Sequence, residues 1–111
     1  MRRERFLSKM KRIEIVVEEQ RVDALVKIIE KHATGYTLVP GATGLGEHGF
    51  RERGMVVLVT VVTEEHLDAI LAAVLPSLNE RANILLVSDV MVLRAEHFIP
   101  EVRAATHGFK A

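Results

Sequence analysis

The residues best suited to binding chemistry lie in one segment, residues 41–54, which reads GATGLGEHGFRERG. Four of the chain's seven glycines fall in the first nine positions of this segment, and a fifth, Gly54, closes it. Glycine permits positive φ angles and close approach of the backbone to a ligand, and successive free N–H groups can bind an anion. Arg51 and Arg53 would add charges suited to phosphate or bicarbonate, and His48 could titrate near neutral pH. The same residues also fit a flexible hairpin loop with solvated charges, so both interpretations stay open.

The sequence shows no set of residues for catalysis or for a metal. The chain has no cysteine, which excludes disulfides, thiolate chemistry and cysteine-based zinc sites. Its five histidines lack HxxxH or HxH spacing, and no Ser-His-Asp or Cys-His set can be assembled. The glycine segment leads into a strand and lacks GK[ST], so it is neither a Walker loop nor a dinucleotide fingerprint. We therefore expect no catalytic residue, no metal and no cofactor.

Composition and charge limit the partners. Fifteen Lys and Arg residues balance fifteen Asp and Glu residues, so no general attraction draws the chain to nucleic acid or to an anionic membrane. Aromatic residues make up 5% with no Trp, which argues against a stacking surface for single-stranded nucleic acid. The basic start, MRRERFLSKMK, has no long apolar run and fits neither a signal peptide nor a membrane span. We expect a cytoplasmic protein that binds no nucleic acid and does not insert into a membrane.

Hydrophobic patterning predicts the six elements that must position the glycine segment. β-branched and alternating runs predict strands at residues 12–17, 36–39, 55–62 and 84–93, the second ended by Pro40. Apolar stripes at helical spacing predict two helices. The first begins at residues 18–20 and ends near Gly35, and the second begins after the N-cap Thr63 and is broken near Pro76.

The order of these elements, strand-helix-strand twice, indicates an α+β protein with a ferredoxin-like βαββαβ fold, an antiparallel sheet with both helices on one face. The strands are so apolar that the second face would expose a large hydrophobic patch, so we expect an oligomer to cover it. A chain of 111 residues fits one domain. We assign residues 1–10 to an N-terminal extension, 11–98 to the domain and 99–111 to a C-terminal tail.

Two stretches carry a resemblance to a known family. They are ATGYTLVPGATGLGEHG, residues 33–49, and RANILLVSDVMVLRAEHF, residues 81–98. Their order, their spacing and the place of the glycine loop resemble the PII signal-transduction superfamily over about residues 10–98. The resemblance is closer to the PII-like branch linked to carboxysomes and to the SbtA bicarbonate transporter than to the nitrogen-regulatory members.

The resemblance implies a homotrimer that binds adenine nucleotides in clefts between subunits and signals through a T-loop, without being an enzyme. It places the nucleotide at Gly35, Tyr36, Thr37, Arg81, Ala82, Asn83 and Arg94. It places the T-loop and an anion at Gly41, Gly44, Gly46, His48, Arg51 and Arg53. Without the family, Arg81 and Arg94 would equally fit solvated charges at the two ends of the last strand.

This sequence also departs from the family. The B-loop pattern glycine-aspartate-glycine-lysine, the paired arginines near the end, a loop tyrosine and a cysteine-rich tail are all absent. These departures favour ADP or AMP over ATP as the ligand. The branch implies bicarbonate as a second ligand, and a bicarbonate transporter or carboxysome component as the protein target.

Three alternatives remain open from the sequence. One is a trimeric protein of the CutA type linked to divalent metals, against which the lack of cysteine and of paired histidines argues. The second is a small enzyme that uses the glycine loop as a lid. The third is a regulatory domain for a small ligand, such as an amino acid, on the same fold.

Overall fold

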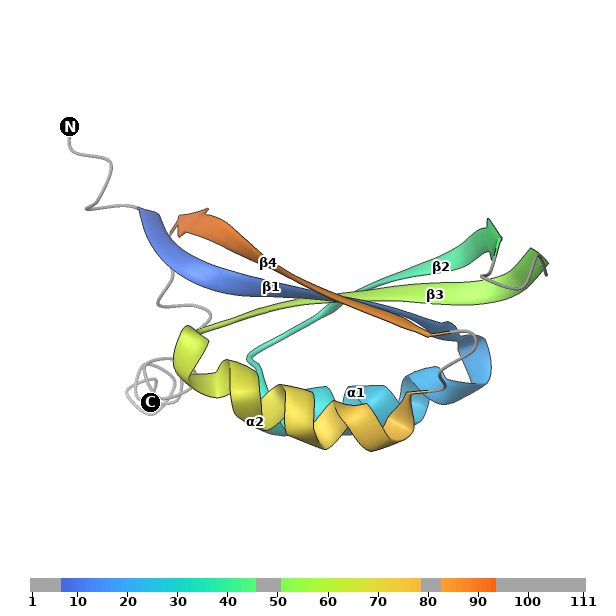
Figure 1. Ribbon diagram of the computed structural model, residues 1–111, viewed down its shortest axis with the longest axis horizontal. Helices are drawn as coiled ribbons and strands as arrows, with labels where there is room; N and C mark the ends of the chain where they lie inside the picture. Colours follow the sequence, from blue (N-terminus) through green and yellow to red (C-terminus); the bar gives the residue numbers. More distant parts are fainter. Residues whose placement is uncertain (1–6, 46–50, 79–82, 94–111) are drawn as a thin grey trace, which may run out of the picture.

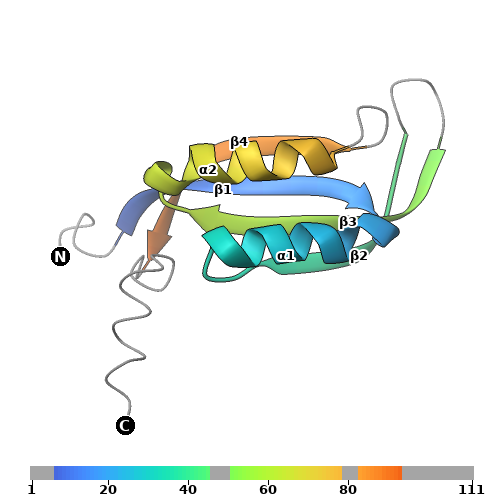
Figure 2. The ribbon, with the colours of Figure 1, turned by 90° about the horizontal axis from the view of Figure 1, so that it is seen from below.

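The computed structural model describes residues 7–45, 51–78 and 83–93, which form one sheet layer and one helix layer (Figure 1). The sheet contains β1 (Leu7–Glu18), β2 (Thr37–Leu45), β3 (Arg51–Val62) and β4 (Ile84–Leu93). The helices α1 (Val22–His32) and α2 (Glu64–Val74) lie side by side on the same face of this sheet (Figures 1 and 2). The arrangement confirms the ferredoxin-like βαββαβ fold of the α+β class.

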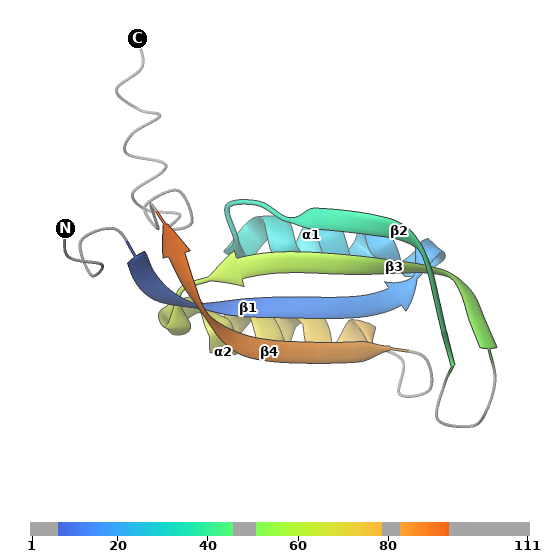
Figure 3. The same ribbon diagram turned by 90° about the horizontal axis from the view of Figure 1, so that it is seen from above.

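The strands are all paired antiparallel, in the spatial order β2-β3-β1-β4. Figure 3 shows this order from the side that the helices leave free. The register aligns residues in rows across the sheet, and Ile15 of β1 lies between Leu58 of β3 and Leu85 of β4. Because side chains alternate along a strand, this row faces the helices and the next row, through Glu14, faces away from them.

The core lies between the sheet and the helices. Every second residue of β1 and β3 points into it, with Ile13, Ile15 and Val17 on β1 and Val56, Leu58 and Val62 on β3. The helices meet these rows with residues three or four positions apart, namely Val22, Leu25, Ile29, Ile70 and Val74. Complete burial of one such side chain stabilises a fold by about 1.5–3 kcal/mol, so this layer holds the sheet rigidly against the helices.

The two helices begin and end close to the predicted boundaries, with one difference. A short 3-10 turn, Glu19–Arg21, precedes α1, and Thr63 is the N-cap of α2 as predicted. The first helix ends at His32, and its C-cap residue is Ala33, whose φ of −130° and ψ of 158° are extended, so Gly35 has no capping role. Both helices have 11 residues, and within the described ranges no helix is long and apolar enough to cross a membrane.

The largest difference from the predicted boundaries concerns the glycine segment. Instead of ending at Pro40, β2 continues through Pro40 and Gly41 to Leu45, and β3 begins at Arg51. Proline is tolerated there because β2 is an edge strand, which pairs with a neighbour on only one side. We call residues 42–45 and 51–54 the arm. Figures 2 and 3 show that the arm bends away from the rest of the sheet.

The first strand also starts earlier than predicted. It begins at Leu7, and Leu7 to Met10 are paired with β4. The last four residues of the stretch assigned to an N-terminal extension are therefore part of the sheet. Residues 1–6 and the C-terminal tail at 99–111 lie outside the described residues.

Candidate functional site

Three of the predicted nucleotide-binding residues, Gly35, Tyr36 and Thr37, lie together where the chain enters β2. The hydroxyl of Thr60 on β3 donates a hydrogen bond of 2.7 Å to the carbonyl oxygen of Gly35. Thr60 is only 2% exposed, so this bond satisfies a buried polar group and fixes the segment before β2 against the sheet. Tyr36 and Thr37 are exposed. The sequence-predicted group thus stands at a free edge of the sheet, on a backbone that the core holds in place.

The arm leaves the sheet through two glycines in the left-handed region. Gly41 has a φ of 76° and Gly54 a φ of 67°. The register of β2 and β3 gains one extra residue on β2 within residues 39–42 and one on β3 within residues 52–55. Each glycine therefore lies at a β-bulge, and bulges bend and twist a strand pair. The two bulges, on facing strands, redirect the arm away from the core.

Three of the six residues predicted to bind an anion, Gly44, Arg51 and Arg53, lie on this arm. Gly44 is opposite Glu52, and Arg51 is opposite Leu45, so much of the arm is paired strand rather than an open loop. Arg53 is part of the same strand, β3. Gly46 and His48 lie outside the described residues. The arm thus places Arg51, Arg53 and Gly44 along one ribbon, and Gly41 lies at its base.

The remaining predicted nucleotide-binding residues precede or follow β4 in the sequence. Asn83 is half-buried and lies immediately before this strand. Arg81, Ala82 and Arg94 lie outside the described residues. Asn83 is therefore the member of this second group whose position the structure describes, at the start of β4.

The first group and Asn83 lie at opposite edges of the sheet. Thr37 opens β2 and Asn83 precedes β4, and the strands between these edges are β3 and β1. Three strand spacings separate the edges, which is about 14 Å. Within the described residues, a single copy of the chain therefore does not bring Asn83 together with the group at the start of β2.

The face of the sheet opposite the helices is mostly apolar, as predicted. We call three adjacent rows of its described side chains, in the middle of β1, the open face. The rows consist of Val39, Val57, Val16 and Ile84, then Thr37, Val59, Glu14 and Leu86, then Val61, Arg12 and Ser88. The exposed fraction is 49% for Val39, 54% for Ile84 and 52% for Leu86.

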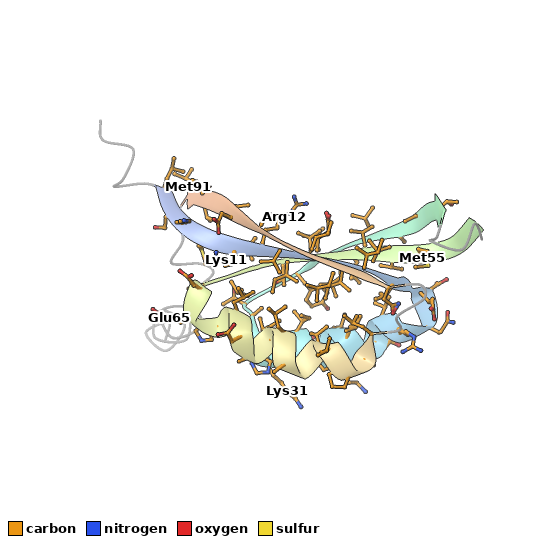
Figure 4. The ribbon with its side chains drawn as sticks, viewed as in Figure 1. Lys11, Arg12, Lys31, Met55, Glu65 and Met91 are labelled. Atoms are coloured by element: carbon orange, nitrogen blue, oxygen red, sulfur yellow. The ribbon has the colours of Figure 1, made fainter. Side chains whose placement is uncertain are left out.

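The sequence reasoning missed the ion pairs of β1, which include one on the open face and one near the N-terminal end of the strand. Arg12 and Glu14 form the first on the open face, with 3.0 Å between the guanidinium Nη2 and the carboxylate Oε1. The signal was present, since the alternation of Arg12, Ile13 and Glu14 in a strand places both charges on the face opposite the core residue. Figure 4 shows Arg12 on the side of the sheet away from the helices.

The second ion pair lies near the N-terminal end of β1. The ammonium group of Lys11 donates a hydrogen bond to Asp89 of β4, and the Lys9 ammonium lies 3.6 Å from the same carboxylate. The hydrogen bond from Lys11 lowers the pKa of Asp89, and the charges of Lys11 and Lys9 lower it further. The same hydrogen bond raises the pKa of Lys11, with Glu64 adding a smaller attraction. This pair connects the two strands at the end of the sheet opposite the arm.

Within residues 7–45, 51–78 and 83–93, no cluster of three or more His, Asp or Glu side chains could hold a metal ion. Chemically, the described site therefore offers backbone amides, one phenol, one threonine hydroxyl and one amide side chain at the two sheet edges. Such groups bind and orient a ligand.

Solved structures of known proteins share this fold. The PII-like protein CPII from Thiomonas intermedia K12, in a structure bound to ADP, AMP and bicarbonate, has a TM-score of 0.75 and 22% identity. The match covers 84% of this chain and 96% of that chain. A protein of Thermus thermophilus classed as PII-like and signalling has a TM-score of 0.70 and 32% identity, with coverages of 84% and 98%. CutA1 from Oryza sativa is a weaker match, with a TM-score of 0.59, 18% identity and coverages of 77% and 82%.

Sequence comparison completes the assignment. A search of curated proteins finds no match to this chain. The family described as Nitrogen regulatory protein P-II matches residues 10–97. This range includes β1 from Met10 onward, the whole of β2, β3 and β4, and both helices. This chain therefore belongs to the P-II family.

Proposed function

We propose that this chain is a PII-like regulatory protein that acts as a homotrimer and senses ADP or AMP in clefts between its subunits. Membership of the P-II family supports the regulatory role, and the likeness to CPII, whose structure contains ADP, AMP and bicarbonate, supports the ligands. Bicarbonate is the candidate second ligand. Such a sensor needs no catalysed reaction. A ligand that binds one of two conformations more tightly shifts the population towards it, and this change of conformation is the signal.

One observation carries this proposal. Gly35, Tyr36 and Thr37 lie at the β2 edge of the sheet and Asn83 at the β4 edge, and these two edge strands are about 14 Å apart. A ligand that needs both groups must bind where the β2 edge of one copy meets the β4 edge of the next. In a closed ring of three copies, every such edge has a partner and three equivalent clefts result.

The arm could change its conformation when a ligand binds in this cleft. Gly41 lies on the β2 edge that would line the cleft, and it is also the first of the two glycines at which the arm bends. A ligand that contacts this backbone in one arm conformation and not in another shifts the population between them. In the cytoplasm, the arm would then present a different surface to a protein target, for which a bicarbonate transporter or a carboxysome component is the candidate.

Calorimetric titration tests the ligands. We expect ADP and AMP to bind with one site per chain, ATP to bind more weakly, and bicarbonate to raise the affinity for the nucleotide. An assembled protein that binds no adenosine phosphate, with or without bicarbonate, would contradict the proposed function. Titration with copper in the same series tests the CutA-type alternative, which predicts metal binding in place of nucleotide binding.

A mixing experiment tests where the site lies. Thr37→Glu places a negative charge in the β2 group, and Arg81→Ala removes a positive charge from the β4 group, so each variant alone should lose nucleotide binding. After both variants are unfolded, mixed and refolded together, about a quarter of the clefts would combine two wild-type halves, because each cleft draws its halves from different copies. Recovery of that fraction of binding supports a shared cleft. A site within one subunit predicts no recovery.

A further inference from the structure

The open face combines apolar rows with one pair of opposite charges. Around Arg12 and Glu14, the neighbouring strands place Val59 and Val61 on one side and Leu86 and Ser88 on the other. Arg12 and Glu14 are thus the charged side chains of the three described rows, and both lie on the central strand β1. Their side chains are 44% and 29% exposed in the single chain. A charged pair in the middle of an apolar surface becomes desolvated when anything covers that surface.

The edge strand β4, which lies beside this pair, also exposes apolar side chains that an association would bury. Ile84 and Leu86 are exposed on the open face, while Val87, Met91 and Leu93 are exposed along the alternate positions of the same strand. An edge strand that exposes apolar side chains at both sets of positions, together with unpaired backbone groups, is a surface that associates. The exposed apolar area therefore continues from the open face around β4.

A second copy of this chain is the occupant that these observations favour. The open face carries one cation and one anion, so it is electrostatically complementary to a copy of itself. The whole chain has fifteen residues of each sign and a net charge of zero, so copies do not repel each other at long range. In a symmetric ring, the same two charges of every copy approach the interface, and Arg12 of one copy can pair with Glu14 of another.

We propose that Arg12 and Glu14 set the register of assembly of this protein, by forming ion pairs between copies within an otherwise apolar sheet-to-sheet interface. This inference rests on the homotrimer of the proposed function, and it adds the residues that decide which arrangement of the sheets is stable. An apolar surface alone permits many sliding registers. A charge buried without its partner is strongly destabilising, so registers that separate the charges are excluded.

Single charge reversals test the proposal. Arg12→Glu gives every copy two negative charges on the open face, and Glu14→Arg gives every copy two positive charges. We expect each variant to raise the protein concentration at half-dissociation by at least about a hundredfold, because like charges meet in the interface. Sedimentation velocity across a dilution series measures this concentration, and circular dichroism verifies that the secondary structure is kept.

Matched controls change the same charge on the other side of the molecule. Lys31→Glu on α1 and Glu65→Arg on α2 alter the net charge as much as the two test variants do. Figure 4 shows both side chains on the helix layer, with Lys31 pointing away from the sheet. We expect both controls to assemble like the wild type.

Two further samples show whether the pairing is between copies. The double variant Arg12→Glu with Glu14→Arg should assemble within about tenfold of the wild type, because the charges are exchanged and not unbalanced. In a mixed trimer of the two single variants, two of the three interfaces join unlike copies and one joins like copies, so an equal mixture should have a lower concentration at half-dissociation than either single variant alone. If a single variant fails to fold alone, co-refolding of the two variants provides the same test.

The outcomes separate this inference from the proposed function. If both single reversals assemble and bind ADP like the wild type, the register proposal is wrong and the function stands. If the double variant assembles but the mixture dissociates at the same concentration as the single variants, the charges pair only within a chain and the proposal is also wrong. A wild-type protein that sediments as a monomer when saturated with ADP would contradict the homotrimer itself.

Discussion

Thr60 shows how one buried hydroxyl connects the core to the candidate site. Its hydrogen bond to the Gly35 carbonyl joins β3 to the segment that carries Tyr36 and Thr37. Thr60→Val keeps the shape of the side chain and removes the donor, so we expect a loss of about 1 kcal/mol in the free energy of unfolding. Urea unfolding at one fixed protein concentration measures this loss, because the stability of an oligomer depends on concentration.

A matched substitution distinguishes this bond from a general effect of valine. Thr37→Val changes the same residue type at an exposed position of β2, and we expect a change within about 0.5 kcal/mol. Equal stabilities of Thr60→Val and wild-type protein would show that the hydrogen bond contributes nothing.

Asp89 predicts a dependence of stability on pH. The Lys11 hydrogen bond lowers its pKa below the ordinary value of 3.8, so the folded state favours the carboxylate. The resulting stabilisation is complete above the pKa of the unfolded chain and is lost as the pH falls through the lower pKa of the folded protein. We expect wild-type protein to exceed Asp89→Asn in urea midpoint at pH 7 and pH 5, with the difference shrinking below pH 4. A difference independent of pH down to pH 2 would contradict this assignment.

At the scale of elements, the two bulge glycines control the arm. A Cβ atom at Gly41, Gly54 or Gly35 would have no heavy atom within 4 Å, so an alanine fits sterically at all three positions. Only Gly41 and Gly54 have left-handed φ angles, which disfavour residues with a Cβ by about 1–2 kcal/mol. We expect Gly41→Ala and Gly54→Ala each to lose about 1 kcal/mol of stability and Gly35→Ala to lose less, as measured by urea unfolding.

Asparagine refines this test, because it tolerates the left-handed region better than alanine does. Gly41→Asn should therefore be more stable than Gly41→Ala. The reverse order would show that β2 and β3 adopt a different backbone at the base of the arm.

The same region marks the limit of what the sequence predicts about the elements. The stripe of Leu25 and Ile29 and the alternation around Ile13 and Ile15 depend on local periodicity, and both elements were predicted correctly. Proline and clustered glycines are typical of loops, so local reasoning ended β2 at Pro40. Pairing with β3 outweighs that preference on an edge strand, and pairing is a tertiary contact that a single sequence window does not contain.

The candidate site shows the same limit at the scale of the whole molecule. The apolar character of the open face follows from the composition of the strands, and the structure confirms it for the described rows. The distance between the β2 group and Asn83 follows only from the strand order β2-β3-β1-β4. Neighbours in the sequence, such as β3 and β4, are separated by β1 in the sheet, so no spacing along the chain reveals which residues share a cleft.

The position of the proposed cleft makes nucleotide binding and assembly depend on each other. If each cleft is built from two copies, ADP binds the assembled protein better than the separated chains, and it must stabilise the assembly by the same free energy. With free ADP at a hundred times its Kd, this stabilisation is about 2.7 kcal/mol for each occupied cleft. We therefore expect ADP to lower the protein concentration at half-dissociation by several orders of magnitude in sedimentation experiments. Guanosine diphosphate at the same concentration and ionic strength is the control for the charge of the ligand. A site contained within one subunit would bind ADP equally well before and after dissociation, and the concentration at half-dissociation would then stay constant.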